Sequence, residues 1–375
     1  MNSVIVSADS HVLEPFDLWE RTIGAKYGDR VPRLVKRFEG RDGNYFFCGK
    51  EACVLEELVS VDAATQERVD ELVLAGHDPA ARERCMDKDG VTAEIIHATW
   101  TLYAMRIEDP EFLRDCCRVF NDWLADYCSH NPKRLVGVAM IPIGDVKWAV
   151  AELERVARRG LRGAMIQTQN PPGTPPYRDS VYDPFWAAAE RLDMPVTLHI
   201  ITGRARDPYT LHGDDRSEAP RCSAEIWSEI FPVLSAEFIF GGILDRFPRL
   251  RIVLGEYEVA WVPYFRFRVE RARRLFTSSF GLRKPDRTPA EYLRDNVYFG
   301  MIDDPLAVRA VDDIGADRIL WGSDFPHPPC TYPNTHKILD EVLAGLSPEA
   351  QRKIVGENVT AVYKLHDVIP AGAAR

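Results

Sequence analysis

Short apolar runs alternate with longer segments of helical periodicity along most of the chain, and this alternation restricts the possible folds more than any other feature. About eight of the runs are nearly continuous in apolar residues, as is typical of strands buried on both faces of a parallel sheet. They are Val4–Ala8, Ala93–Ala98, Leu135–Ile141, Gly163–Gln167, Pro195–Ile200, Arg251–Leu254, Val297–Gly300 and Ile319–Gly322. Repeated strand–helix units of this number predict an α/β protein with a single (β/α)₈ TIM barrel.

The segments between these runs carry helix signals. Asp109–His130 opens with Asp-Pro, a capping residue followed by proline at the first helical position. Val146–Arg159 ends in two arginines before Gly160, which is a basic last turn followed by a glycine stop. The remaining helices are predicted at Tyr182–Leu192, Ala224–Asp245, Ala260–Leu275, Pro289–Arg294, Pro305–Ile314 and Thr335–Ala344.

Two regions interrupt the alternation. Residues 14–90 form a long insertion after the first strand, with a hairpin at Phe38–Val54 whose turn is predicted at Asp42-Gly43. Thr202–Arg221 is rich in Gly, Arg, Asp and Pro and is predicted to be an ordered lid or rim. We expect one domain over residues 1–369, including the 14–90 rim region, and a disordered tail at 370–375.

The overall charge and the cysteine pattern exclude some classes of protein. A net charge of −10 argues against a nucleic-acid partner, which needs a clustered basic face. No apolar run reaches the roughly 18–20 residues of a membrane helix, so no membrane association is expected. The N-terminus lacks the pattern of a secretory signal, and the eight cysteines show no C-x-x-C spacing. A cytoplasmic location is therefore expected.

Polar residues lie where several predicted strands end, and the carboxyl ends of barrel strands meet at one rim. Asp9 and His11 follow the first strand and, being two residues apart, face the same side. His199 ends the fifth strand, and Asp324 follows the eighth. Carboxylate oxygens and imidazole nitrogens are donors that Zn²⁺ and Mn²⁺ accept. We predict one divalent metal ion, Zn²⁺ or Mn²⁺, held by Asp9, His11, His199 and Asp324.

Glu256, which follows the sixth strand, has three interpretations. A carboxylate this close to a dication could be a ligand, or a general base whose ionised form the metal favours. It could instead pair with an arginine of the following helix. Taken alone, His199 could be a hydrogen-bonded core residue and Asp324 a helix cap. The placement of four donors at one rim is what favours the metal site.

Other rim residues are candidates for substrate contact. Arginines there could clamp a substrate carboxylate or be solvated surface charges. His97 could contact substrate or pack in the core, and His327 could orient Asp324 or merely belong to the loop. Aromatic residues could form an apolar wall for a ring, although large aromatics mostly pack. The arginines are Arg106, Arg204, Arg206 and Arg221, and the aromatic residues are Trp19, Trp100 and Phe325.

Seven segments resemble one known family. They are SADSHVLEPFDLW, RLVGVAMIPIGD, GLRGAMIQ, MPVTLHI, FPRLRIVLGE, RILWGSDFPHP and GENVTAVY. The chain resembles the amidohydrolase-2 family, in the group of aminocarboxymuconate semialdehyde decarboxylase, from about residue 4 to about residue 365. The D-x-H of SADSHV and the WGSDFPH segment are its most specific motifs. The resemblance implies a (β/α)₈ barrel with a single divalent metal, in which Asp9, His11, His199 and Asp324 match the metal ligands.

The resemblance also implies an activity. Members decarboxylate aromatic or unsaturated acids, and some hydrate double bonds or hydrolyse C–C or C–N bonds. The leading prediction is a decarboxylase of a small carboxylated substrate, with Asp324, Glu256 and His199 as catalytic residues. Well-studied decarboxylases of the group carry Gly-His where this chain has Gly255-Glu256, so a hydrolase or hydratase in which Glu256 activates water is the alternative. A non-catalytic ligand-binding barrel is a third, and relatives suggest a homodimer.

Overall fold

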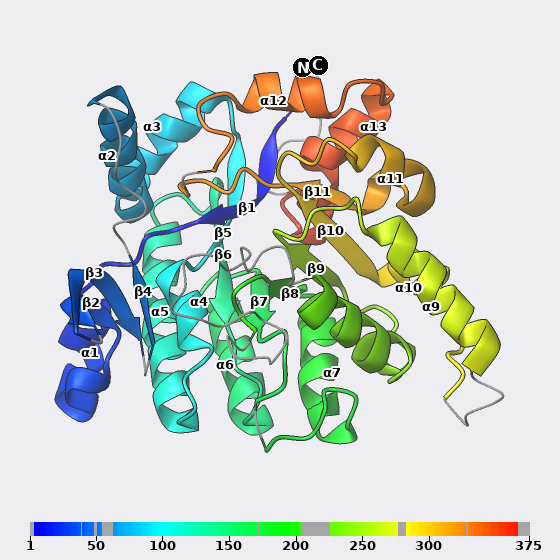
Figure 1. The fold of residues 1–375 in the computed structure, drawn as a ribbon, viewed down its shortest axis with the longest axis horizontal. Helices are drawn as coiled ribbons and strands as arrows, with labels where there is room; N and C mark the ends of the chain where they lie inside the picture. Colours follow the sequence, from blue (N-terminus) through cyan, green and yellow to red (C-terminus); the bar gives the residue numbers. More distant parts are fainter. Residues whose placement is uncertain are drawn as a thin grey trace.

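Eight parallel strands form the centre of the computed structural model, in the order β1-β5-β6-β7-β8-β9-β10-β11 (Figure 1). Their bounds are β1 Val6–His11, β5 Ala93–His97, β6 Leu135–Met140, β7 Gly163–Ile166, β8 Val196–His199, β9 Ile252–Gly255, β10 Val297–Met301 and β11 Ile319–Trp321. Each strand neighbours the next one of the set along the chain, as in a series of strand–helix units. The structure describes residues 4–38, 40–48, 51–54, 63–171, 173–203, 226–276, 283–327 and 329–366.

The first strand meets the segment that follows the last strand, and this contact closes the barrel. Ser10 of β1 forms a parallel bridge with Phe325, and the Asp324 N–H donates to the Asp9 carbonyl at 2.9 Å. Gly322 makes the approach possible, because a Cβ at this position would lie 2.5 Å from the Cβ of Asp9. The predicted (β/α)₈ fold is confirmed, and the residues that join its ends include predicted metal ligands.

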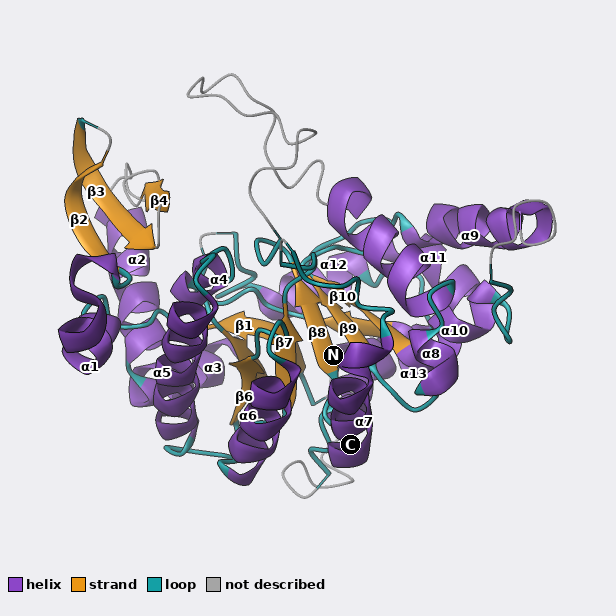
Figure 2. Ribbon diagram, turned by 90° about the horizontal axis from the view of Figure 1, so that it is seen from below, coloured by secondary structure: helices purple, strands orange, loops and turns teal. Residues whose placement is uncertain are grey.

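Helices surround the strands, as Figures 1 and 2 show from two directions. They are α5 Pro110–Cys128, α6 Val146–Arg158, α7 Asp183–Leu192, α9 Val262–Phe276, α10 Pro289–Asn296, α11 Ala307–Ile314, α12 Thr335–Val342, α13 Pro348–Arg352 and α14 Asn358–Val362. The predicted cap of α5 is present, since the Asp109 carboxylate accepts from the N–H groups of Glu111 and Phe112. No helix in the described ranges is both long enough and apolar enough to cross a bilayer.

The prediction of one continuous helix over Ala224–Asp245 is wrong. Two π-helical segments, Ile226–Ile230 and Val233–Ile239, are followed by a short helix, α8 Ile243–Arg246. The chain leaves the helical conformation at Gly242, whose φ of 78° lies in the left-handed region. The apolar periodicity indicated helical backbone, and it did not distinguish an α-helix from the wider π-helix.

The insertion after β1 has its own secondary structure: helix α1 Leu18–Tyr27, strands β2 Arg33–Phe38, β3 Arg41–Cys48 and β4 Glu51–Val54, and helices α2 Ala63–His77 and α3 Pro79–Asp89. The three strands form a separate antiparallel sheet. The predicted turn at Asp42-Gly43 is wrong, because Phe38 lies opposite Arg41 and Asp42 is already paired with Arg37. The register shifts just beyond that pair, so Gly43 belongs to a bulge and not to a turn.

The insertion packs over the start of helix α4 Trp100–Ala104, which follows β5. Phe46 of β3 is 1% exposed, and its ring centroid lies 5.1 Å from that of Trp100. Most of the predicted rim Thr202–Arg221 and the predicted tail 370–375 lie outside the described residues. The single-domain boundary at residue 369 stays a prediction.

Candidate metal centre

Asp9 and His11 project from β1 toward each other, as their spacing of two residues predicted. The His11 Nε2 lies 3.3 Å from Asp9 Oδ1. The other ring nitrogen, Nδ1, is 2.6 Å from the Ala98 carbonyl oxygen, a contact that requires a proton on Nδ1. The lone pair of Nε2 is then free to bind a cation, and the ring cannot rotate without losing its hydrogen bond.

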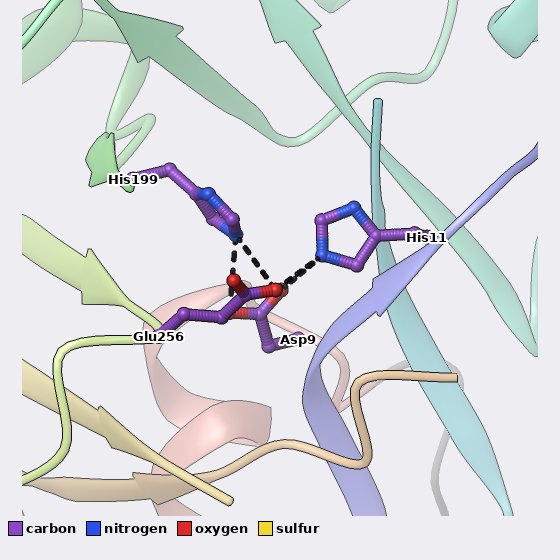
Figure 3. Close-up of side chains that lie close together, drawn as sticks. All are labelled: Asp9, His11, His199 and Glu256. Atoms are coloured by element: carbon purple, nitrogen blue, oxygen red, sulfur yellow. Dashed lines mark hydrogen bonds and ion pairs between the residues drawn. The ribbon is translucent and has the colours of Figure 1, made fainter. Parts of the chain in front are cut away.

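His199, at the end of β8, points toward the carboxylates of Asp9 and Glu256 from the side opposite His11 (Figure 3). Its Nε2 lies 3.5 Å from both Asp9 Oδ2 and Glu256 Oε1, while its Nδ1 is 3.0 Å from the Ile200 carbonyl oxygen. Gly255 leaves the space for this meeting. A Cβ at residue 255 would lie 2.5 Å from His199 Cδ2 and 2.9 Å from Asp9 Oδ2.

Glu256 and Asp324 follow strands β9 and β11 in an unusual backbone conformation. Their φ angles are 61° and 57°, in the left-handed region that costs a residue other than glycine about 1–3 kcal/mol. The strained backbone turns both carboxylates toward the cluster, where Glu256 Oε1 lies 2.9 Å from His11 Nε2. Asp324 Oδ1 lies 3.7 Å from the same nitrogen.

A chain of hydrogen bonds leads away from Asp324. His327 Nδ1 lies 2.6 Å from Asp324 Oδ1, and its Nε2 lies 3.0 Å from Thr99 Oγ1. The His327 ring also stacks on His11, with centroids 4.2 Å apart. His327 therefore contacts both a predicted ligand and the predicted acid, in the orienting position that the sequence suggested for it.

The electrostatics show mutual stabilisation of opposite charges in a dry site. Burial disfavours a charge on His11, yet the adjacent carboxylates of Asp9 and Glu256 raise its pKa to about 9. Burial would raise the pKa of Asp9, but the charge of His199 and contacts with other imidazoles hold it well below its usual range. Burial and the nearby Glu256 carboxylate raise the pKa of Asp324 well above its usual range. Burial is also the main cause that lowers the pKa of His97 to about 4 and that of His327 to about 3.

The donor set fits one divalent metal ion. Both carboxylate oxygens of Asp9 and the Nε2 of His199 are buried without a hydrogen-bond partner, which is costly unless a cation faces them. Donor atoms of Asp9, His11, His199 and Glu256 all lie within 4.8 Å of one another. A second set, within the same limit, joins His11 and Glu256 to Asp324 and His327. Oxygen and imidazole donors of this kind suit Mn²⁺ or Zn²⁺.

Three predicted ligands, Asp9, His11 and His199, thus meet with Glu256 in one cluster. Asp324 lies at its margin and shares His11 and Glu256 with it. The interpretation of Glu256 as partner of a following arginine receives no support, since its carboxylate lies against His11, His199 and His327. Whether Asp324 is a ligand, as the resemblance implies, stays a prediction.

The predicted substrate-contact residues lie in different surroundings. His97 is 1% exposed and its Nε2 lies 3.7 Å from Asp9 Oδ1. Arg106 donates to the carbonyls of Ile201 and Gly203, just after β8. The aromatic candidates are all buried: Trp100 packs on Phe46, Phe325 packs on Tyr332, and Trp19 donates to the Cys116 carbonyl. Arg204, Arg206 and Arg221 lie outside the described residues, so their predicted roles are untested.

Several residues around the site were not anticipated. Ser7, Ser10 and Ser323 form a buried group of hydroxyls where the barrel closes, with oxygens 2.9–3.2 Å apart. Glu14, fully buried, accepts from the N–H groups of Thr99, Trp100 and Thr101 and so fixes the start of α4. The serines in SADS and WGSD were visible as polar residues in apolar runs, which is a signal that could have been used.

Comparisons with known proteins agree with this fold. A family model described as Amidohydrolase matches residues 58–365. The gamma-resorcylate decarboxylase of Polaromonas sp. strain JS666 is 27% identical over 294 residues, which cover 76% of this chain and 87% of that protein. The structure of an amidohydrolase from Mycobacterium avium subsp. paratuberculosis K-10 superposes with a TM-score of 0.75 at 22% identity, over 97% of this chain and 100% of that one.

A dihydroxybenzoic acid decarboxylase from Polaromonas sp. JS666, solved with manganese and the inhibitor 2-nitroresorcinol, superposes with a TM-score of 0.67 at 20% identity. That comparison covers 98% of this chain and 99% of the other. The family model spans β5 to β11 and includes two of the four predicted ligand positions, His199 and Asp324. The chain belongs to the amidohydrolase family of enzymes.

Proposed function

We propose that the protein is a metal-dependent, non-oxidative decarboxylase of a small carboxylated aromatic acid or a related unsaturated acid. The observation that carries the proposal is the meeting of three carboxylates around His11. Oxygens of Asp9, Glu256 and Asp324 lie 3.3, 2.9 and 3.7 Å from its Nε2. Two carboxylates balance the charge of a divalent ion, so the third is able to hold a proton beside it. Relatives named as decarboxylases of gamma-resorcylate and dihydroxybenzoic acid support the same activity.

Asp9, His11 and His199 would hold the ion, with a further oxygen from Glu256 or Asp324. A bound divalent ion would supply positive charge to the substrate carboxylate and to an adjacent oxygen. Asp324 gives its proton to the carbon that bears the carboxylate, and the bond from that carbon to the carboxylate breaks to release CO₂. The electron pair of the broken bond stays with the substrate and restores its conjugation. His327, through its contact with Oδ1, keeps the Asp324 carboxyl in position during the transfer.

The remaining predicted residues take supporting roles in this proposal. His97, beside Asp9, and Arg106, beside the segment after β8, are proposed to contact the substrate. Arg204 and Arg206 are proposed to clamp its carboxylate, and Trp100 and Phe325 to shape the apolar surroundings of its ring. A homodimer in the cytoplasm is the expected state of the protein.

The test is CO₂ release from gamma-resorcylate and other hydroxybenzoates by Mn²⁺-loaded and Zn²⁺-loaded protein. Asp324→Asn should lower kcat by about 10²–10⁴-fold, because its amide has no acidic proton to give. Asp303→Asn is the matched control, since Asp303 is an exposed carboxylate that follows β10 on the same rim. Full activity in Asp324→Asn would contradict the assigned proton donor.

Glu256→Gln separates the decarboxylase from the hydrolase or hydratase. Decarboxylation should survive this change in large part, provided that metal content is restored, whereas reactions that consume water should fail with the loss of the base. Metal content by plasma mass spectrometry tells whether Glu256 is also a ligand. Turnover that consumes water, releases no CO₂ and is lost in Glu256→Gln would replace the proposal with a hydrolase or hydratase.

A further inference from the structure

The buried cation Arg82 lies outside the cluster of predicted ligands and contacts the backbone that carries them. Arg82 belongs to helix α3 of the insertion and its side chain is fully buried. Its Nε donates to the carboxylate of Glu94 on β5, which is 2% exposed. Taking two such charges out of water costs several kcal/mol for each ion, and the cost is recovered only if the remaining donors also find partners.

The other guanidinium nitrogens reach the end of β1 and the segment that follows β11. Nη1 donates to the His11 carbonyl at 2.6 Å, and Nη2 contacts the Phe325 carbonyl at 3.4 Å. The guanidinium carbon lies 5.1 Å from the centre of the Phe325 ring, in the geometry of a cation–π contact. One planar group therefore links β5, the end of β1 and the residue after Asp324.

These contacts bear directly on His11. Its N–H donates to the Phe325 carbonyl, its carbonyl accepts from Arg82, and its Nδ1 is held by the Ala98 carbonyl. With the backbone fixed on both sides and the ring fixed at one nitrogen, the direction of Nε2 is set. The Phe325 carbonyl accepts hydrogen bonds from both His11 and Arg82. These bonds also fix the backbone of Phe325, the residue next to Asp324.

We propose that Arg82, with Glu94, is a positioning residue for the metal centre: the pair sets metal affinity by holding the end of β1 in register with the segment that follows β11. Since Arg82 comes from the insertion, the insertion takes part in building the site as well as in covering α4. The inference rests on the metal site of the proposed function and does not depend on the reaction being decarboxylation.

The experiment measures the Kd for Mn²⁺ by calorimetry, and the electron paramagnetic resonance spectrum of bound Mn²⁺, in three variants. Arg82→Lys keeps the charge and loses the planar fork. Arg82→Met/Glu94→Met removes both buried charges together, which proteins often tolerate. Arg155→Lys is the matched control, because Arg155 is likewise paired with a buried glutamate, Glu152 on α6, through two hydrogen bonds.

Both Arg82 variants should bind Mn²⁺ about 10–100-fold more weakly than the wild type and change the Mn²⁺ spectrum, as is usual when groups that orient ligands are lost. Arg155→Lys should change neither. A folded double variant with the wild-type Kd and spectrum would reduce Arg82 to a structural ion pair and overturn the inference. A wild type that binds Mn²⁺ normally and decarboxylates no acid would instead overturn the proposed activity and leave the role of Arg82 intact.

Discussion

The sharpest test of the metal centre is to fill the space that Gly255 leaves. In Gly255→Ala, the added methyl group would start 2.5 Å from His199 Cδ2 and 2.9 Å from Asp9 Oδ2. Carbon atoms in contact lie about 3.5–4.0 Å apart, so the imidazole of His199 must move by roughly 1 Å or more. It has little room to do so, since its ring is fully buried and lies 5.1 and 5.6 Å, between centroids, from those of His11 and His97.

A displacement of that size is large for a metal site, where ligand distances hold to about 0.2 Å. We expect the Kd for Mn²⁺ to rise by at least about 10–100-fold, the effect of much smaller disturbances around metal ligands. Overpacking itself should lower the free energy of unfolding by about 1–3 kcal/mol. Calorimetric titration gives the first quantity and denaturant unfolding of the metal-free protein gives the second.

Gly137→Ala is the matched control, because its methyl group would meet Leu161 Cδ2 at 2.6 Å and Leu124 Cδ2 at 2.9 Å. The clash is nearly the same in size, but it falls on leucines and not on ligands. Gly137→Ala should therefore lose stability and keep its metal affinity. Wild-type metal affinity in Gly255→Ala would refute the location of the site. An equal loss of affinity in both variants would mean that packing strain anywhere in the barrel suffices, and would refute the reasoning from direct contact.

Three further predictions concern stability and metal affinity. In the folded, metal-free protein the pKa of His11 is about 9, against 6.5 in the unfolded chain. The stability that protonated His11 contributes to the fold is therefore fully present below pH 6.5 and is lost as the pH rises through about 9. Metal must displace the proton from His11, so Mn²⁺ affinity should increase over the same pH range; a flat affinity from pH 6.5 to 9 would contradict this. Asp109→Ala should lower the free energy of unfolding by about 1 kcal/mol through loss of the α5 cap, with kcat unchanged, and a fall in kcat after correction for folded protein would argue against a purely structural cap.

Local sequence patterns predicted those features of the fold that depend on neighbouring residues, such as strand faces and helix starts. The pairing of Asp9 with His11 followed from the two-residue period of a strand, and the start of α5 followed from Asp-Pro at residues 109 and 110. Asp42-Gly43 is a strong turn signal in isolation, but the register with β2 places it in a strand. Pairing between strands decided the outcome there, and no local pattern contains it.

The same distinction applies to the site. His199 ends a clearly apolar strand, so its position at the rim could be predicted. The orientation of Glu256 depends on a left-handed backbone conformation that no local sequence pattern indicates. Arg82 stands among other charged residues of α3, in the segment PAARERCMDKD, and nothing in that segment separates it from surface arginines. Its burial results from contacts with β1, β5 and the residue after Asp324, which only the closed barrel brings together.

The closure of the barrel by its first and last strands has a consequence for how the protein is made. Ser7 and Ser323, whose hydroxyls meet at this junction, are 316 residues apart in the chain. At a synthesis rate of about 5–20 residues per second, β1 waits roughly 15–60 s on the ribosome before its second neighbour exists. During that time one edge of an apolar strand is open to pairing with other chains, so this interval is when chaperones would matter most. The cluster in which His11 and Glu256 join Asp9 to Asp324 can assemble only after this interval ends.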